Sequence, residues 1–182
     1  VHPIKSCRPV RCVHAVVQPR GLAHDRRYMV TDDTGLFVTL RTLPRLATID
    51  VAILDEHYEV VLPDGPTFEL PHELDEGPLV RVGVWSDAVI AREAPQASAA
   101  LSAWAARPLR LVGMGAAVSH RATPDGASPV SFADAYPMLA LSRASVDDLS
   151  ARVGRSMQID RFRPNLVVDG MAAVDGNDVD VQ

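Results

Sequence analysis

Lysine is nearly absent from this sequence. Lys5 is the only lysine, and the other seventeen of its 18 basic residues are arginines. In so biased a composition, a lysine without a task would be expected to be arginine as well. We therefore treat Lys5 as the first candidate functional residue, against the alternative that it is solvated beside a frayed terminus.

Cysteines, long apolar runs and paired histidines are also scarce. Cys7 and Cys12 lie too close in sequence to staple a fold, which favours free thiols in a reducing compartment. No apolar stretch approaches the ~20 residues of a membrane span, and no signal peptide is recognised. We expect a cytoplasmic protein with no membrane partner. The 6 histidines are scattered singly, so no metal site is predicted.

The charge balance is acidic. The net charge is -5 and the pI is about 5.6, which argues against nucleic acid as a partner. A local basic pocket would instead suit a small anionic cofactor. With 182 residues, 47% hydrophobic and 23% charged, the chain can form one globular domain or two small ones.

The first half of the chain has the pattern of short strands separated by turns. Turn signals stand at Asp32-Asp33-Thr34-Gly35 and at Pro63-Asp64-Gly65-Pro66. The expected strands are residues 26–30, 37–41, 47–54, 58–62, 67–70 and 79–85. Many short strands with regular turns indicate a barrel or a sandwich.

The period changes in the second half. Residues 95–106 are spaced as a helix, and a strand is expected at 109–114. Residues 115–131 read as a loop or domain boundary. A strand at 137–141, a helix with a capping box at Ser145 and Asp148 that ends at Gly154, and a strand at 166–168 follow. The fold class is therefore mainly β with a few helices.

Three short segments could bind an anion. Lys5 and Ser6 supply an ammonium and a hydroxyl, both of which bind phosphate. Arg26, beside Asp25, could face a ligand, although a surface charge cluster explains it equally. In Arg161–Asn165, Arg163 could fork onto a phosphate and Asn165 could read a base or pterin edge. Pro164 is expected to hold Arg163 extended; the alternative is a plain turn before a strand.

Other reactive residues give weaker signals. Cys7 could be a nucleophile with a lowered pKa, but we favour the interpretation that it is a small, buried hydrophobic side chain. Asp134 could orient a neighbour, although turn chemistry alone accounts for it. No G-x-S-x-G frame and no glycine-rich phosphate loop is present, so no catalytic residue is identified.

The order of these segments resembles MOSC-containing proteins, the molybdenum cofactor sulfurase C-terminal type. The resemblance spans nearly the whole chain. It rests on seven ordered blocks, which are Pro3–Cys7, Gly21–Arg26, Thr39–Leu46, Val82–Asp87, Arg110–Val112 after a helix with Trp104, Val130–Pro137 and Asp160–Val168.

The resemblance implies a fold and a cofactor. Proteins similar to the mitochondrial amidoxime-reducing component combine an N-terminal β-barrel-like domain, here 1–115, with a MOSC β-barrel, of which 116–182 would be the first part. They hold molybdopterin, the molybdenum cofactor, between the two domains. The cofactor contacts implied for this sequence are Lys5, Ser6, Arg26, Arg163 and Asn165, with Asp134 near the metal.

The sequence departs from the family pattern at the metal. The molybdenum ligand of the family is a cysteine downstream of the F-R-P-N motif, and this sequence ends at Gln182 before that segment. Ala135 also replaces a small hydroxyl residue of amidoxime reducers. We expect cofactor-phosphate contacts but no metal ligation and no turnover by these 182 residues alone. In its complete form the protein would reduce N-hydroxylated compounds, with a separate electron-donor protein.

Three alternatives stay open. The protein could be a carrier that hands on molybdenum cofactor or sulfur and reduces nothing. It could bind pyridoxal phosphate, for which Lys5 is the only possible Schiff-base lysine. It could also be a plain β-domain with no ligand.

Overall fold

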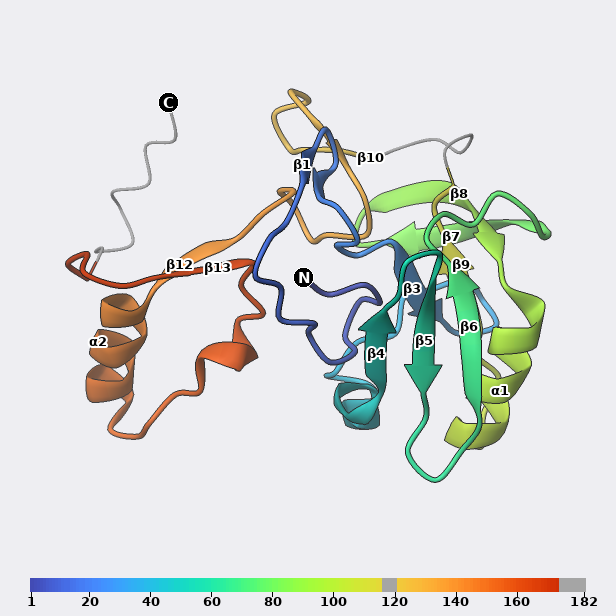
Figure 1. Cartoon of the computed structure of the whole chain (residues 1–182), viewed down its shortest axis with the longest axis horizontal. Coiled ribbons are helices and arrows are strands. Elements are labelled where there is room, and N and C mark those ends of the chain that lie inside the picture. Colours follow the sequence, from blue (N-terminus) through green and yellow to red (C-terminus); the bar gives the residue numbers. More distant parts are fainter. Residues whose placement is uncertain (116–120, 174–182) are drawn as a thin grey trace. The chain divides into compact units, whose positions relative to one another are not determined.

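The computed structural model describes residues 1–115 and 121–173. The chain divides into two compact units, Val1–Pro137 and Met138–Gln182 (Figure 1). Most regular elements of the described residues are β-strands and two are α-helices, which confirms the expected fold class.

A four-stranded antiparallel sheet organises the first unit. Its strand order is β3-β9-β8-β7, with β3 (Tyr28–Thr31), β7 (Leu79–Val84), β8 (Asp87–Glu93) and β9 (Arg110–Gly113). In β7, Val82 and Val84 are buried while Leu79 and Arg81 are exposed, as its alternating pattern predicts. The sequence did not predict β8 as a separate strand.

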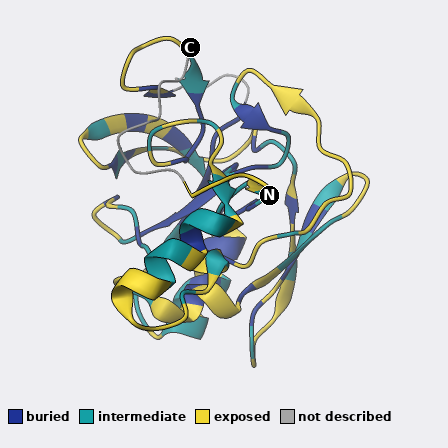
Figure 2. Cartoon of the chain, turned by 90° about the vertical axis from the view of Figure 1, so that its left-hand side faces the viewer, coloured by how far each residue is buried: buried dark blue, intermediate teal, exposed yellow. Residues whose placement is uncertain are grey.

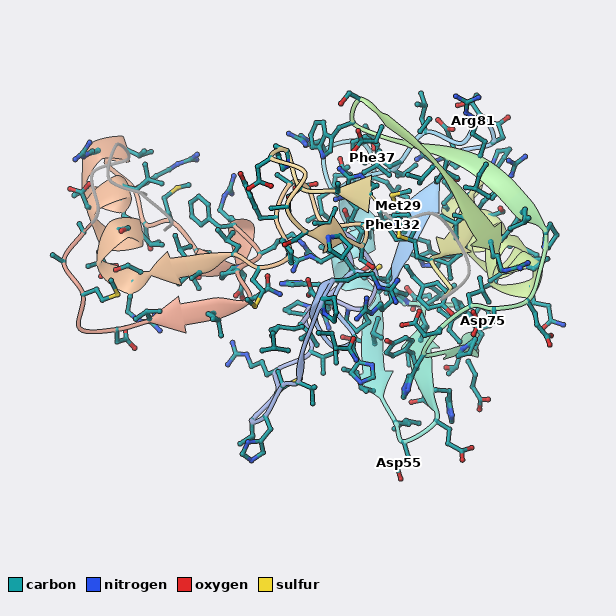
Figure 3. All side chains as sticks on the ribbon, turned by 90° about the horizontal axis from the view of Figure 1, so that it is seen from above. Met29, Phe37, Asp55, Asp75, Arg81 and Phe132 are labelled. Carbon is teal, nitrogen blue, oxygen red and sulfur yellow. The ribbon has the colours of Figure 1, made fainter. Side chains whose placement is uncertain are left out.

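A three-stranded antiparallel sheet completes the framework of this unit. It consists of β4 (Asp50–Ile53), β5 (His57–Val61) and β6 (Thr67–Pro71), which lie side by side in Figure 1. The strands expected at 58–62 and 67–70 are confirmed, whereas within 47–54 only Asp50–Ile53 forms a strand. Asp55, in the β4–β5 turn, points away from the sheet (Figure 3).

The predicted turn after β3 forms, but the strand expected at 37–41 does not. Asp32 Oδ1 accepts hydrogen bonds from the backbone N–H of Thr34 and of Leu36, both at 3.0 Å. Beyond the turn, Leu36 bridges to Gly83, Phe37 bridges to Thr31 and Val38 N donates to Val30 O at 2.8 Å, but no strand forms. The same edge of β3 is already occupied at its start by residues 3–5, so little of it is left for a hairpin partner.

Helix α1 (Pro95–Ala105) is fastened to β9 by two of its serines. Ser98 Oγ accepts the backbone N–H of Leu111 at 2.9 Å, and Ser102 Oγ accepts that of Leu109 at 2.9 Å. The helix begins with proline in its first turn and ends where Ala106 turns left-handed, at φ 51. These hydrogen bonds satisfy two backbone N–H groups that would otherwise need a partner from a neighbouring strand.

Two apolar clusters form the core of the first unit. The larger joins the three-stranded sheet, β3, β9 and α1, and includes Tyr28, Tyr58 and Leu101. The smaller includes Met29 and Phe132, both fully buried and close together in Figure 3.

Short elements decorate this unit. They are β1 (Val17–Gln18), β2 (Gly21–Leu22), the 3-10 helix η1 (Pro44–Thr48), β10 (Arg121–Ala122) and β11 (Pro129–Val130). β1 is exposed whereas β2 is buried (Figure 2). The β10–β11 pair lies inside the stretch predicted as a loop, of which residues 116–120 fall outside the described part.

The second unit contains a parallel strand pair joined by a helix. Its elements are β12 (Ala140–Ser142), α2 (Arg143–Val153), the 3-10 helix η2 (Ile159–Arg161) and β13 (Leu166–Val168). Because β12 runs directly into α2, the N-cap is Ser142, which makes no side-chain cap bond. The capping box predicted at Ser145 was therefore wrong, while the helix end at Gly154 is confirmed. The domain boundary near residue 115 stays a prediction.

Candidate functional site

The N-terminal segment places Lys5 beside the start of β3. The two stretches run parallel and exchange backbone hydrogen bonds, from Lys5 N to Tyr28 O at 2.8 Å, from Tyr28 N to Pro3 O at 3.0 Å and from Arg26 N to His2 O at 2.7 Å. This ladder fixes Lys5 and its neighbour Ser6 in the same region as Arg26. Two motifs separated in sequence are thus brought together.

The Lys5 ammonium is buried and held from one side. The residue is 7% exposed, and Nζ donates to the Phe132 carbonyl at 2.8 Å and to Asp134 Oδ1 at 2.5 Å. Burial lowers the pKa of Lys5, Asp134 opposes that shift, and the nearby cations Arg26 and Arg121 add to it. An ammonium has three donors, of which these two acceptors use two, and the Phe37 ring centre lies 5.8 Å from Nζ.

Asp134 is the counter-charge of Lys5. Its Oδ1 also accepts the indole N–H of Trp85 at 3.0 Å. Partial burial alone would raise the pKa of this carboxyl, but the charge and hydrogen bond of Lys5, with the Trp85 bond, hold it below its ordinary value. Asp134 is therefore a carboxylate at neutral pH, although its side chain is 68% exposed.

Ser6 and Arg26 both adopt unusual backbone conformations. Ser6 is buried at φ 74 and Arg26 stands at φ 48, in the left-handed region that non-glycine residues rarely occupy. Arg26 Nη1 forms an ion pair with Asp25, and Asp25 Oδ1 accepts the backbone N–H of His2 at 2.8 Å. Clustered backbone strain of this kind is typical of ligand sites.

Arg121 is a member of this region that the sequence did not reveal. It is 6% exposed, and its Nε lies 2.7 Å from Asp87 Oδ2. Its guanidinium also donates to the carbonyls of Ala133 at 2.5 Å and Asp134 at 3.1 Å. One arginine among seventeen offers no pattern in sequence, and only the contacts single it out.

A hollow of about 670 Å³ opens next to Asp134. Its walls include Trp85, Asp87, Arg121 and Thr123 as well as Asp134. This volume is in the range of small-molecule sites. The Trp85 indole is half exposed, which leaves aromatic surface for a ligand.

The arginines that follow the first turn contact indoles. The Arg41 guanidinium lies 5.3 Å from the Trp85 ring centre, and that of Arg45 lies 4.5 Å from the Trp104 ring centre. Arg41 thus contacts Trp85, a residue that lines the hollow, whereas Arg45 contacts Trp104 of α1.

Arg163 and Asn165 belong to the second unit. Arg163 is left-handed at φ 55 instead of extended, because η2 continues into it through a bond from Arg163 N to Asp160 O at 3.2 Å. The expected extended conformation was wrong. Asn165 Oδ1 accepts the backbone N–H of Leu139 at 3.0 Å, so that oxygen steadies the entry to β12. A shared site with Lys5 stays a prediction.

The cysteines do not form a metal centre. Cys7 is buried and Cys12 exposed, and both are free thiols. Within residues 1–115 and 121–173, no group of three or more His, Cys, Asp and Glu side chains is arranged to hold a metal ion. The same ranges contain no helix long and apolar enough to cross a membrane.

Two family models match this chain. Residues 1–110 match the MOSC N-terminal beta barrel domain, and residues 127–180 match the MOSC domain. The chain belongs to the MOSC family, in the group with an N-terminal β-barrel domain. The resemblance inferred from the ordered motifs is therefore confirmed.

Curated relatives of this MOSC chain are amidoxime-reducing components. It is 27% identical to mitochondrial amidoxime-reducing component 1 of Mus musculus, over 93% of this chain and 54% of that protein. It is 30% identical to mitochondrial amidoxime reducing component 2 of Bos taurus, over 95% and 55%. The MOSC chain thus spans about half the length of the curated relatives it matches.

A solved structure from Bordetella bronchiseptica is also similar. It covers 57% of this chain and 90% of its own, with 19% identity and a TM-score of 0.44. That likeness is too low to bear on the fold.

The cytoplasmic location expected from the sequence is contradicted. The relatives are named mitochondrial proteins, including mitochondrial amidoxime reducing component 2 of Homo sapiens. The expectation rested on free cysteines and on the lack of a recognised leader, and neither feature distinguishes one reducing compartment from another.

Proposed function

We propose that this MOSC chain is part of a molybdenum cofactor-dependent reductase of N-hydroxylated compounds. The observation that carries the proposal is the buried Lys5 ammonium, which sits with Ser6 and Arg26 in one region of the first unit. The names of the curated relatives, which are amidoxime-reducing components, support the reaction class.

The residues of the first unit fit an anionic group. Lys5 is close enough to Arg26 and Arg121 for both to lower its pKa, so three cations share this region with the carboxylates of Asp25, Asp87 and Asp134. An added anion would compensate for the burial of Lys5. A neutral ligand would leave that burial uncompensated.

Each residue has a distinct part in holding the cofactor. Lys5 would place a point charge on a phosphate oxygen, and Ser6 would donate its hydroxyl to the same group. Arg26 would present a guanidinium that Asp25 keeps in position. Arg163 and Asn165 would contact the phosphate or pterin from the second unit.

The bound cofactor would supply the redox chemistry. Asp134 would stay ionised near the reacting end and keep Lys5 charged. No residue among those described is assigned as a metal ligand, and electrons would come from a separate donor protein.

The test is cofactor retention by a variant of the only lysine. The protein is produced with ample molybdenum cofactor synthesis, as wild type, as Lys5→Met and as the control Arg8→Met. Arg8 removes a cation from the same segment, but its ion pair with Asp50 at 2.8 Å is solvent-exposed. Molybdenum per protein is measured by mass spectrometry, and pterin by fluorescence after oxidation.

Loss of one charge-assisted hydrogen bond costs about 1.5–3 kcal/mol, or roughly 10- to 150-fold in affinity. We expect Lys5→Met to lose cofactor while Arg8→Met retains it. Equal retention by both variants would refute the proposed site. Retention of cofactor by the complete protein without reduction of any N-hydroxylated compound would instead indicate a carrier.

A further inference from the structure

The loop that follows β11 lies between two buried cations. Arg121 donates to the carbonyl of Ala133 at 2.5 Å and to that of Asp134 at 3.1 Å. Lys5 donates to the carbonyl of the preceding residue, Phe132, at 2.8 Å. Neighbouring carbonyls of one short stretch are thus divided between the two side chains.

This division follows from backbone geometry. The carbonyl of Phe132 faces Lys5, whereas the carbonyls of Ala133 and Asp134 both face Arg121, because the chain bends at Asp134. The Ser131 carbonyl lies 3.5 Å from Arg121 Nη1, on the same side as that of Ala133. Arg121 therefore fixes the orientation in which the Phe132 carbonyl faces Lys5.

Arg121 is itself rigidly placed. It stands in β10, paired in register with Val130 of β11, so it lies directly beside the loop it binds. Asp87 holds its Nε at 2.7 Å from β8. A planar guanidinium presents several donors in a fixed fork, which a lysine ammonium does not.

The side chain of Asp134 is fixed by the same arrangement. Arg121 holds the Asp134 backbone carbonyl, and Trp85 holds its Oδ1 at 3.0 Å. Lys5 thus finds both of its acceptors, one backbone oxygen and one carboxylate oxygen, already oriented. The acceptors of Lys5 depend on a residue that Lys5 does not contact.

We propose that Arg121 is a positioning residue for the anion site, which it serves by holding the 131–134 loop so that Lys5 is aimed and kept charged. This proposal rests on the proposed function, because it assigns Arg121 a part in the same cofactor site. Arg121 acts through the loop and needs no contact with the bound anion.

A positioning role differs from a purely electrostatic one. Arg121→Lys keeps the charge but loses the fork that reaches two carbonyls and Asp87. If Arg121 acts by position, Lys5 loses its oriented acceptors in this variant and its pKa falls below that of the wild type. If Arg121 acts only by charge, Arg121→Lys leaves the Lys5 pKa unchanged.

The single lysine makes this measurement direct. With ¹³C-lysine incorporated, the wild type gives one lysine Cε signal, which reports the Lys5 pKa during a pH titration. Each arginine-to-lysine variant gives a second signal from the introduced lysine, and the Lys5 signal is assigned as the one that disappears when Lys5→Met is added to that variant. The same signal follows binding of pyrophosphate, used as a probe for the cofactor's anionic end. The matched control is Arg20→Lys, in which the altered arginine pairs with Glu73 and does not touch the loop.

We expect Arg121→Lys to weaken pyrophosphate binding by about tenfold or more, equivalent to one charge-assisted hydrogen bond, and to lower the Lys5 pKa. Arg20→Lys should change neither. If Arg121→Lys stays within twofold of wild type in affinity and leaves the Lys5 pKa unchanged, the proposal is overturned, whatever its effect on melting temperature.

Two further outcomes are distinguishable. If Arg121→Lys does not fold, Asp87→Asn removes one anchor of the guanidinium and should weaken pyrophosphate binding less; an unchanged affinity would overturn the proposal. If pyrophosphate leaves the wild-type lysine signal unmoved, the anion site of the proposed function fails. The Lys5 pKa in Arg121→Lys still tests the positioning role without ligand.

Discussion

Replacing Lys5 by methionine should cost the fold little, although it removes a buried ion pair. The ammonium side chain is 9% exposed, whereas its partner Asp134 is 68% exposed. Burial is the largest influence on the Lys5 pKa and lowers it, so the charge is held at a cost that Asp134 does not fully return. Function and stability would therefore be opposed at this residue.

The magnitude follows from the contacts that are lost. Replacing both partners of a buried charge pair with apolar groups is often neutral or stabilising by about 1–4 kcal/mol, which is an upper bound on the gain here, because Lys5→Met replaces only the cation. In the opposite direction, the Phe132 carbonyl loses its hydrogen-bond donor, which lowers the free energy of unfolding by about 1–3 kcal/mol. Asp134 can be hydrated, so it adds little. The net change in the free energy of unfolding should lie within about 2 kcal/mol of zero.

Arg121→Met supplies the contrast. It removes charge-assisted bonds to the carbonyls of Ala133 and Asp134 and leaves Asp87 without its partner. At about 1.5–3 kcal/mol for each such bond, the loss should exceed about 3 kcal/mol. At a conversion of about 2 °C per kcal/mol for both variants, that is a fall in melting temperature of about 6 °C or more, against about 4 °C or less for Lys5→Met.

The pH dependence of the free energy of unfolding provides an independent test. Because the folded-state pKa of Lys5 lies below its unfolded value, the unfolded chain binds more protons between the two values. The Lys5 contribution to stability therefore rises with pH across that window, which ends at the ordinary value of 10.5. Lys5→Met should lack this rise.

Urea unfolding of the wild type, Lys5→Met and Arg121→Met, followed by circular dichroism from neutral to alkaline pH, tests both the expected stabilities and their pH dependence. A destabilisation by Lys5→Met as large as that of Arg121→Met would refute the reasoning. It would make Lys5 a structural residue and remove the argument that its burial is maintained for a ligand.

Three other changes have defined outcomes. Asp134→Asn should lower the pKa of Lys5 further, since the opposing charge is lost; the lone lysine signal in a ¹³C spectrum checks this. Ser98→Ala should lower the free energy of unfolding by about 1–3 kcal/mol, because it orphans the buried backbone N–H of Leu111; urea titration measures it. Burial raises the pKa of Tyr28, so the folded state keeps a proton that the unfolded chain releases above pH 10.0. Stability should fall there, and by less in Tyr28→Phe, as thermal unfolding at several alkaline pH values would show.

The strands of the first unit were largely predictable, because their signals are local. Residues 58–62 and 67–70 alternate around a strong turn, and they form β5 and β6. The strand at 37–41 failed for a nonlocal reason, since residues 3–5 occupy the edge of β3 that it needed. Sequence periodicity describes one segment, whereas the competition for a strand edge involves two.

The candidate site divides in the same way. Lys5 stood out by composition, and its proximity to Arg26 and Asp134 is now visible in the contacts of the first unit. Arg121 could not be found in the same manner, because its neighbours carry no motif and its bonds go to backbone carbonyls. Every residue type has a main-chain oxygen, so a residue that acts through such oxygens requires no particular residue types as its neighbours.

That difference explains why a lysine and an arginine share this loop. The residue meant for a ligand needs a free donor and a charge that responds to its surroundings, which suits an ammonium on a flexible stem. The residue that holds the loop needs several fixed donors and a charge that persists when buried, which suits a guanidinium. Lys5 binds two acceptors through an ammonium that has three donors, while Arg121 distributes its donors over two carbonyls and Asp87. Exchanging the two residue types should therefore damage the site at both positions, even though the total charge stays the same.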